Sequence, residues 1–494
     1  MNAMQRLCIP SIFNIFEEDI HLHNFMSFNH TPNTLDEQRD KIKYGSPKLK
    51  IIAPCTLENG ILKLAPVAQA YYEEQFHEIS SSMCFFIPAS GSGSRMFDFL
   101  HAERKSDSPE LDHMAKCFVN QLKDFAFYKN LSTAQREKIA SFQSDKELID
   151  FLIKEDDNGI NLGGLPKGLV PFHSYTEGQR SAFDEHLRQG IDLSAKPVNF
   201  HFTIQNNHKG LFEASLLNFK SNHQKKLEAG FSFQDSQTDA FVFDANQKPI
   251  KSNTNVYLRR PSGHGALLKN LNELKEQYVL IKNIDNVQHG HQAQAGIRVW
   301  RMLCGILHHV KCELKAIKDD PNPKRLKEIS EEFSLFSSEE IEAAKDNELF
   351  KRMINKPIRV CGMVLNEGKA GGGPFYVDLN GNKSKQIVEG VQVKGNGQKK
   401  IFDSSTHFNP VMMVIDTFDF EGQKFDLSKF SNDNQYSVVH KNYEGQPITF
   451  IERPGLWNGS MFSWNTIFIE IPAETFTPVK TILDLLKPGH QQNS

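Results

Sequence analysis

The chain has 494 residues, and its 57 basic and 60 acidic side chains give a formal net charge of −3. This length allows roughly two or three domains, and the balanced charge excludes the strongly basic surface that is typical of nucleic-acid-binding proteins. No apolar stretch reaches the roughly 20 residues that a membrane-spanning helix needs, so we expect no membrane partner.

The cysteines and the first residues of the chain bear on the compartment. The seven cysteines are scattered and form no Cys-x-x-Cys pair, as expected for free thiols in a reducing environment. The apolar segment Leu7–Phe16 runs directly into acidic residues without a small-residue cleavage site, which argues against a signal peptide. We therefore expect a cytoplasmic protein.

The first chemically informative element is a glycine-rich turn. Residues 1–80 predict an irregular and partly helical lead-in, and the apolar run Met83–Ile87 then predicts a buried strand. The turn that follows reads Pro-Ala-Ser-Gly-Ser-Gly-Ser-Arg-Met over residues 88–96. Glycine lets backbone N–H groups approach an anion, and the Arg95 guanidinium suits phosphate oxygens. A purely structural strand-to-helix turn is an equally good interpretation of this loop alone, since it lacks the Gly-Lys-Ser/Thr ending of a P-loop.

A helical segment and a second glycine-rich segment follow. Residues 97–160 are charged and helix-patterned, and we interpret them as an insertion. Lys167 then stands in the turn Leu165–Gly168, where it could place a point charge against a phosphate. A solvated turn lysine is the more frequent use of such a residue. Apolar patterns further predict a strand, a helix and another strand, at residues 198–204, 211–219 and 240–243.

Two further turns carry candidate functional residues. His264 stands between two glycines at the start of a predicted helix, where it is poorly placed for core packing and suits contact with a ligand. Asp285 ends the apolar strand 278–284. A carboxylate there needs a cation or hydrogen-bond donors, which makes Mg²⁺ a candidate partner. A helix N-cap is the structural alternative for Asp285.

The order of these elements predicts an α/β fold with a mostly parallel mixed sheet. We divide the chain into the lead-in 1–80, a nucleotide-binding domain over 81–355 with helical insertions at 97–160 and 324–354, and a β-rich C-terminal part over 356–494. Ligands of such sheets bind beyond the carboxyl ends of the strands, where the turn around Gly91 and Asp285 are both expected.

Together these segments resemble the nucleotide-sugar pyrophosphorylases, in particular the UDP-sugar pyrophosphorylase branch of the GT-A-type nucleotidyltransferases, which have a Rossmann-like domain. The matching segments, in the family's order, are Gly91-Ser92-Gly93-Ser94-Arg95, Pro166-Lys167-Gly168, Gly263-His264-Gly265 and Asp285-Asn286. Weaker similarities are Phe233-Gln234, Ile387-Val388-Glu389 and His440-Lys441. Ser90 and Ser94 depart from the family's glycine and threonine, and residues 97–160 separate the glycine loop from Lys167 by more than the family does.

The resemblance implies an activity and a set of roles. A sugar 1-phosphate would attack the α-phosphorus of a nucleoside triphosphate, most closely UTP, and release pyrophosphate with the help of Mg²⁺. The implied roles are catalysis for Arg95, Lys167 and Lys441, nucleotide binding for Gly91, Ser92, Gly93, Gln234, Gly263, His264 and Gly265, sugar binding for Glu389, His407 and Asn409, and metal binding for Asp285.

Two alternatives stay open. One is a GT-A glycosyltransferase, although Asp285-Asn286-Val287 is not the Asp-x-Asp motif that such enzymes generally use. The other is a protein that binds a nucleotide sugar without turning it over. The whole chain also resembles a bacterial family of no assigned function, through the segments Ser405–Pro410 and Pro454–Gly459.

Overall fold

The computed structural model describes residues 34–79, 81–102, 108–154, 159–223, 227–368, 371–379, 381–443 and 445–492. The segment Leu7–Phe16, on which the prediction about a signal peptide rests, lies outside the described residues. Among the helices of the described segments, none combines the length and the apolarity of a membrane span.

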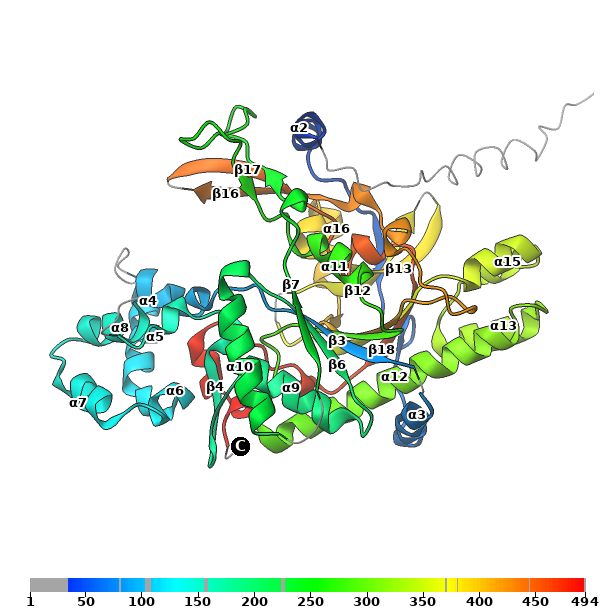
Figure 1. Cartoon of the computed structure of the whole chain (residues 1–494). Coiled ribbons are helices and arrows are strands. Elements are labelled where there is room, and N and C mark those ends of the chain that lie inside the picture. Colours follow the sequence, from blue (N-terminus) through cyan, green and yellow to red (C-terminus); the bar gives the residue numbers. More distant parts are fainter. Residues whose placement is uncertain are drawn as a thin grey trace, which may run out of the picture.

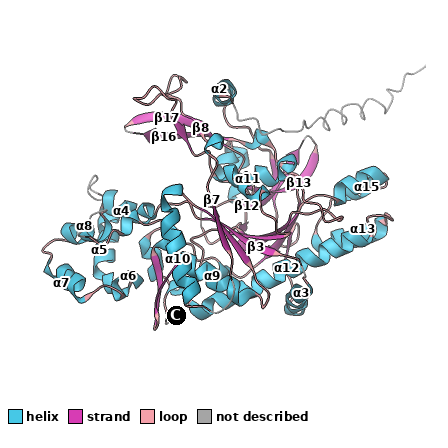
Figure 2. Ribbon diagram, in the orientation of Figure 1, coloured by secondary structure: helices cyan, strands magenta, loops and turns pink. Residues whose placement is uncertain are grey.

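A mixed sheet of nine strands forms the centre of the molecule (Figures 1 and 2). Its order is β2-β18-β11-β15-β10-β3-β6-β7, and β14 pairs with β11. β14 and β15 run antiparallel to their neighbours, whereas the other pairs are parallel. The strands are β2 Ile61–Leu62, β3 Met83–Pro88, β6 Asn199–Thr203, β7 Ala229–Ser232, β10 Tyr278–Lys282, β11 Ile358–Leu365, β14 His407–Phe408, β15 Met412–Asp416 and β18 Asn465–Glu470. The predicted α/β class with a mostly parallel mixed sheet is confirmed.

The strand register shows that the strand ends lie along two opposite edges of this sheet. Asp416, at the end of β15, pairs with Tyr278 at the start of β10 and with Ile358 at the start of β11. Ile358 in turn pairs with Asn465, the first residue of β18. The parallel strands therefore all begin at one edge, which we call the amino edge, and all end at the other, the carboxyl edge.

Alternating side chains of the sheet pack against two different layers. In β3, Phe85 belongs to a core formed with helices α3 (Pro66–Glu78), α9 (Ala182–Leu193) and α12 (Ala293–Ala316). Its neighbours Cys84 and Phe86 face a second core that includes α11 (Leu268–Asn272). Both faces of β3 are thus covered, which explains why its sequence is apolar throughout and does not alternate with polar residues.

The predicted helical insertion lies to one side of the sheet (Figure 1). Its helices are α4 Asp98–Ala102, α5 Pro109–Asn120, α6 Ala126–Lys129, α7 Thr133–Ser141 and α8 Asp145–Ile153, and the strands β4 Pro171–Tyr175 and β5 Gly178–Ser181 follow. The other described helices are α2 Leu35–Tyr44, α10 Lys209–Ser221, α13 Pro323–Phe333, α14 Ser338–Ala343, α15 Asn347–Ile354 and α16 Asn396–Asp403. Helices over residues 97–160 and 324–354 were expected from the sequence, and the structure has helices in both segments.

Small sheets surround the central one. β1 (Ile51–Pro54), β12 (Gly373–Leu379) and β13 (Asn382–Val388) form one of them. Two-stranded ribbons are formed by β8 (Ala240–Phe241) with β9 (Arg259–Arg260), and by β16 (Ser437–Tyr443) with β17 (Gln446–Glu452). The strand predicted at 240–243 therefore lies outside the central sheet, because an apolar run shows that a strand is buried but not which partner it has.

The central sheet also draws on segments that the sequence analysis had assigned to separate parts. β2 comes from the lead-in, and β11, β15 and β18 come from the C-terminal part. Strands on both sides of residue 355 thus share one core. The division of the chain into three parts stays a prediction, since a shared sheet does not show where independent folding units end.

Candidate active site

The glycine loop after β3 is bonded directly to the segment that carries Lys167. The N–H of Gly93 donates to the carbonyl of Leu165 at 3.0 Å, and the N–H of Lys167 donates to the carbonyl of Gly91 at 3.1 Å. A Cβ at Gly93 would lie 2.4 Å from the Leu165 carbonyl oxygen, so only glycine allows this approach, whereas a Cβ at Gly91 would meet nothing within 4 Å. Two motifs that are separated by the helical insertion are therefore neighbours at the carboxyl edge.

Asp285 follows β10 at the same edge and holds two lysines. The Lys167 ammonium donates to Asp285 Oδ2 at 2.7 Å, and the Lys480 ammonium donates to the same oxygen at 3.0 Å. The backbone of Val479 also donates to the Asp285 carbonyl at 3.0 Å, which holds the C-terminal segment against the end of β10. Two ammonium groups against one carboxylate leave an excess of positive charge, which suits a polyphosphate.

The electrostatics of Asp285 keep it ionised. Burial by itself raises the pKa of this carboxyl, but the Lys167 and Lys480 ammonium groups outweigh burial, so the pKa lies below its usual range. The second oxygen, Oδ1, is buried and has no hydrogen-bond partner among the described residues. Asp285 therefore keeps one charged oxygen available for a further ligand.

This free oxygen could serve as one ligand of a magnesium ion. Mg²⁺ prefers oxygen ligands and is commonly bound by one or two carboxylates together with phosphates and water. Within the described segments, no group of three or more His, Cys, Asp or Glu side chains could hold a metal by itself. Asp285 can thus contribute one ligand, with phosphate oxygens completing the set.

The rest of the glycine loop is ordered by small polar contacts. The N–H of Ser94 donates to Ser92 Oγ at 3.2 Å, and the two hydroxyl oxygens lie 2.7 Å apart. Arg95 stands on the turn Gly93–Phe97 with its side chain exposed. Gln205, which follows β6, donates to the carbonyl of Ser90 at 2.6 Å. The sequence analysis missed Gln205, although its place directly after a buried strand was a usable signal.

Gln234, the predicted base-contacting residue, follows β7 at the carboxyl edge. Its amide donates to Asp239 Oδ1 at 2.8 Å, and its side chain is half-buried. The preceding residue is fixed by Asn270, whose amide donates to the Phe233 carbonyl at 2.8 Å. The loop after the outer strand β7 is therefore held in place by α11.

The Gly263–Gly265 turn is fitted against the segment that precedes β18. Gly263 has φ +76°, in the left-handed region, and a Cβ at Gly265 would lie 1.9 Å from the Pro454 carbonyl oxygen. His264 Nδ1 accepts from the N–H of Leu456 at 2.9 Å, and its ring stacks on Trp457 with the centroids 4.0 Å apart. Both glycines are thus required for this packing. Trp457 belongs to the segment Pro454–Gly459, but no local pattern predicted that its ring would meet His264.

Glu389 completes this cluster. Burial lowers the pKa of His264, so the ring is neutral at pH 7, and its accepting Nδ1 places the proton on Nε2. Nε2 lies 3.8 Å from Oε1 of Glu389. The same oxygen accepts a hydrogen bond from the Trp457 indole N–H at 3.2 Å. Burial, aided by Glu452, raises the pKa of Glu389. A carboxylate beside a stacked indole and imidazole can accept hydrogen bonds from hydroxyl groups.

Two of the three predicted sugar-binding residues, Glu389 and Asn409, meet at Gly372. A Cβ at Gly372 would lie 2.9 Å from Glu389 Cγ, and the Gly372 carbonyl accepts from the N–H of Asn409 at 2.7 Å. His407, the first residue of β14, is buried and pairs with Leu365 at the end of β11. Its Nε2 lies 3.4 Å from Oε1 of Glu470, at the end of β18. These residues therefore also belong to the carboxyl edge.

Lys441 is placed differently from the other predicted catalytic residues. It lies on β16 with an exposed side chain, and its ammonium stands 5.4 Å from the centre of the Phe450 ring. The β16–β17 ribbon is connected to the segment that contains β8, through a bridge between Thr449 and Phe243. The C-terminal lysine that reaches Asp285 is Lys480, which no motif indicated.

Comparisons with known proteins found a family model that matches the chain, and several solved structures that are similar to it at low sequence identity. The chain is similar to a UDP-N-acetylglucosamine pyrophosphorylase from Trypanosoma brucei, with a TM-score of 0.48 and 13% identity over 92% of this chain and 75% of that one. It is also similar to a UDP-glucose pyrophosphorylase variant from Leishmania major, with a TM-score of 0.42 and 13% identity over 92% of this chain and 76% of that one. No curated protein matches the chain.

The same comparisons settle membership at the level of the whole chain. The segments Ser405–Pro410 and Pro454–Gly459 predicted membership of a family of no assigned function, and a bacterial source stays a prediction. A family model matches residues 18–491, and the chain therefore belongs to the family described as "Domain of unknown function (DUF4301)".

Proposed function

We propose that the protein joins a sugar 1-phosphate to a nucleoside triphosphate, with UTP as the preferred nucleotide, and releases pyrophosphate. The observation that carries this proposal is the direct bonding of the glycine loop, Lys167 and Asp285 at the carboxyl edge. Three of the four segments that carry the sequence resemblance are thereby joined in one place, with two ammonium groups around a buried carboxylate.

The proposed reaction needs alignment and positive charge rather than a general base. A phosphate oxygen of the sugar 1-phosphate forms a bond to the α-phosphorus, and the bond from that phosphorus to the bridging oxygen of the β-phosphate breaks. The second pKa of a phosphate monoester is about 6, so the nucleophile is largely ionised at neutral pH. Catalysis then rests on holding the two phosphates in line and neutralising their charge.

We assign different residues at the carboxyl edge to the departing pyrophosphate and to the α-phosphate. We assign the loop N–H groups around Gly91 and the Arg95 guanidinium to the departing pyrophosphate, because the space at Gly91 is open and Arg95 is exposed. We assign Lys167 and Lys480 to the α-phosphate, which would take over the charge that Asp285 now balances. When bound at Asp285 Oδ1, Mg²⁺ would supply further positive charge to the phosphates.

The remaining residues suit the two ends of the product. Gln234 lies after the outer strand β7, and we assign it to the base, for which its amide would exchange its present hydrogen bond to Asp239. Glu389 and Asn409, which flank Gly372, would accept and donate hydrogen bonds to sugar hydroxyls, and the neutral His264 would orient Glu389. We propose this second cluster as the sugar side of the site.

Pyrophosphate release tests the proposal. The wild-type protein with Mg²⁺ is assayed across four nucleoside triphosphates and a panel of sugar 1-phosphates, beside Asp285→Asn and the matched control Asp403→Asn at the exposed end of α16. We expect release that requires both substrates and is lost in Asp285→Asn alone. Binding of a nucleotide sugar without release would contradict the proposal in favour of a nucleotide-sugar-binding protein. Transfer of the sugar to an acceptor would favour a glycosyltransferase.

A further inference from the structure

The C-terminal segment of the chain is closed into a loop around Lys480. This segment, drawn in red in Figure 1, lies beside β4. Nε2 of His490 donates to the Thr477 carbonyl at 2.9 Å, so the two ends of the segment 477–490 meet. Lys480, whose ammonium reaches Asp285, stands between these ends. We call this closed segment the C-terminal strap.

A chain of polar side chains joins the C-terminal strap to the core. His173 on β4 is wholly buried, and its Nε2 lies 2.9 Å from Nδ1 of His490. Its Nδ1 lies 2.8 Å from Oε1 of Glu185 on α9, which is also buried. The Tyr175 hydroxyl, which accepts from the N–H of Gly290, donates to the same carboxylate oxygen at 2.6 Å. The strap is thus tied to β4 and α9 through a buried histidine and a buried glutamate.

The hydrogen bonds along this chain need one proton more than its neutral groups supply. Three contacts run from Glu185 to His173, on to His490 and on to a backbone carbonyl of the strap, and each contact needs one hydrogen. A neutral imidazole carries one N–H, so the two histidines supply two hydrogens, and neither a carboxylate nor a carbonyl supplies the third. An additional proton must therefore reside on one of these groups.

His490 does not carry the additional proton. Burial, followed by the charge of His173, lowers the pKa of His490 to about 3, so its ring is neutral at pH 7. The neutral ring uses its one N–H, at Nε2, for the strap carbonyl, and its Nδ1 therefore accepts from Nε2 of His173. The additional proton then lies between Nδ1 of His173 and Oε1 of Glu185.

The groups around Glu185 keep it ionised, which places that proton on His173. Burial raises the pKa of Tyr175, and the charge of Glu185 raises it further, so the phenol keeps its proton and donates a hydrogen bond to the carboxylate. The Arg180 guanidinium lies 4.0 Å from Oε2 of Glu185. Burial lowers the pKa of Lys282 to about 7, and the charge of Glu185 opposes that effect. A buried carboxylate with donors and cations beside it is stable as an anion.

We propose that His173 and Glu185 form a buried imidazolium–carboxylate pair that positions Lys480 for the proposed reaction. The imidazolium donates to His490, which closes the strap and so holds the Lys480 ammonium at Asp285. A charged donor makes a stronger hydrogen bond than a neutral one, and a group that contacts a reacting phosphate must be held in place. The role of Lys480 rests on the function proposed for the carboxyl edge, whereas the buried ion pair does not.

NMR spectroscopy of the full chain with ¹⁵N-labelled histidine tests the ion pair. At pH 7.5 we expect the ring of His173, assigned by the signal lost in His173→Gln, to carry a proton on both nitrogens. Glu185→Gln should make this ring neutral, because an amide can itself supply the third hydrogen of the chain. A neutral His173 in the wild-type protein, or an imidazolium signal that is unchanged in Glu185→Gln, would overturn the proposed pair.

The rate of pyrophosphate release tests the positioning role. His490→Ala cuts the link near the end of the chain, and we expect it to lower kcat about three- to tenfold. His113→Ala, at an exposed histidine of α5, is the matched control and should leave kcat unchanged. In the Lys480→Gln background, His490→Ala should lower kcat by less than about twofold, because its effect passes through Lys480.

The outcomes separate this inference from the function on which it rests. An unchanged kcat in His490→Ala, or an equal loss with and without Lys480, would overturn the positioning role while pyrophosphate release stands. Absence of pyrophosphate release from the wild-type protein would overturn the proposed function and the positioning role together. The NMR spectra would still decide whether His173 and Glu185 form an ion pair.

Discussion

The two edges of the central sheet both gather lysines, but they balance the charge differently. At the carboxyl edge, Lys167 and Lys480 share the carboxylate of Asp285. At the amino edge, Lys356 and Lys385 line a polar cavity together with four glutamates, but neither lysine forms an ion pair with a carboxylate among the described residues. The first pair is neutralised by direct contact, whereas Glu340 acts on the second pair only through space.

This difference has a thermodynamic consequence. Burial lowers the pKa of Lys167, and the ion pair with Asp285 opposes that effect, so a phosphate that enters the carboxyl edge replaces an existing ionic contact. Burial also lowers the pKa of Lys385, to about 8, and no ion pair among the described residues opposes it there. The lysines of one edge are thus held by a direct ion pair, and those of the other are not.

Lys167→Gln should have the largest effect on the carboxyl edge. We expect kcat for pyrophosphate release to fall about a hundredfold or more, because a charged donor to the reacting phosphate is removed. The free energy of unfolding should fall by less than about 2 kcal/mol, since Asp285 keeps Lys480 as a partner. Steady-state assays and urea unfolding measure the two quantities, and a loss of stability that accounts for the lost activity would indicate a structural role.

A pair of glycine variants separates ligand approach from packing. Gly93→Ala should lower the free energy of unfolding by about 1–3 kcal/mol, because its Cβ would meet the Leu165 carbonyl at 2.4 Å. Gly91→Ala should leave stability nearly unchanged, since its Cβ meets nothing within 4 Å, yet it should lower activity by blocking the phosphate. Full activity in folded Gly91→Ala would contradict the assignment of this loop to phosphate.

A smaller change in kcat should distinguish the two C-terminal lysines, Lys480 and Lys441. Lys480→Gln should lower kcat about tenfold, less than Lys167→Gln, because Lys480 is 65% exposed and Lys167 is 14% exposed. The variant for comparison is Lys441→Gln, on the β16–β17 ribbon. The sequence resemblance implies a catalytic role for Lys441, whereas the ion pair with Asp285 favours that role for Lys480. A larger loss in Lys441→Gln than in Lys480→Gln would show that the ribbon supplies the catalytic lysine.

The amino edge should show a modest pH dependence. The unfolded chain binds a proton at Lys385 up to a pKa of about 10.4, whereas the folded protein releases it near pH 8. The unfolded state therefore holds more protons between these values, so the free energy of unfolding should rise with pH, by about 1–3 kcal/mol. The groups acting on Lys385 are Cys55, Glu340, Cys361 and Arg359. Urea unfolding at pH 7.5 and 9.5 should show this rise reduced in Lys385→Met, and an unchanged rise would show that Lys385 is not its source.

Local patterns in the sequence predicted three of the nine strands of the central sheet, and one end of the site. Continuous apolar runs predicted β3 and β10, because strands covered on both faces need apolar side chains throughout. The alternation of Phe200 and Phe202 with polar residues predicted β6. The loop at Gly91 and the carboxylate of Asp285 were predicted for the same edge, because parallel strands end together. Each of these inferences needs only residues that are neighbours in the chain.

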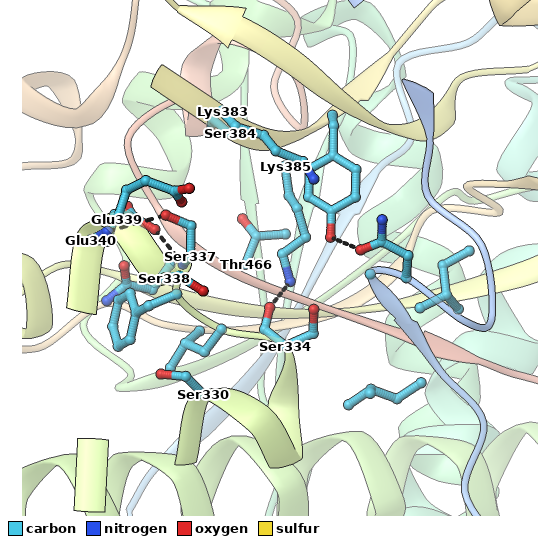
Figure 3. Close-up of a pocket in the computed structure, with 18 of the residues that line it drawn as sticks. Ser330, Ser334, Ser337, Ser338, Glu339, Glu340, Lys383, Ser384, Lys385 and Thr466 are labelled. Atoms are coloured by element: carbon cyan, nitrogen blue, oxygen red, sulfur yellow. Dashed lines mark hydrogen bonds between the residues drawn. The ribbon is translucent and has the colours of Figure 1, made fainter. Parts of the chain in front are cut away.

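Other features depend on residues that are far apart in the chain. Lys480 is 195 residues from Asp285, and the Trp457 ring reaches His264 across a similar separation. A polar cavity at the amino edge (Figure 3) joins segments from residue 57 to residue 466. No local pattern predicts such meetings, because they follow from the order and register of strands in the sheet.

The sequence by itself thus determined the α/β class, the glycine turns that close backbone approach requires, and the carboxylate at the end of a buried strand. Only the tertiary structure decided that Lys480 shares Asp285 with Lys167, that β11, β15 and β18 join the same sheet as β3, and that Lys385 forms no ion pair with a carboxylate of the described residues. The physical reason is that propensity and periodicity act between chain neighbours, whereas charge balance depends on which distant segments the sheet brings together.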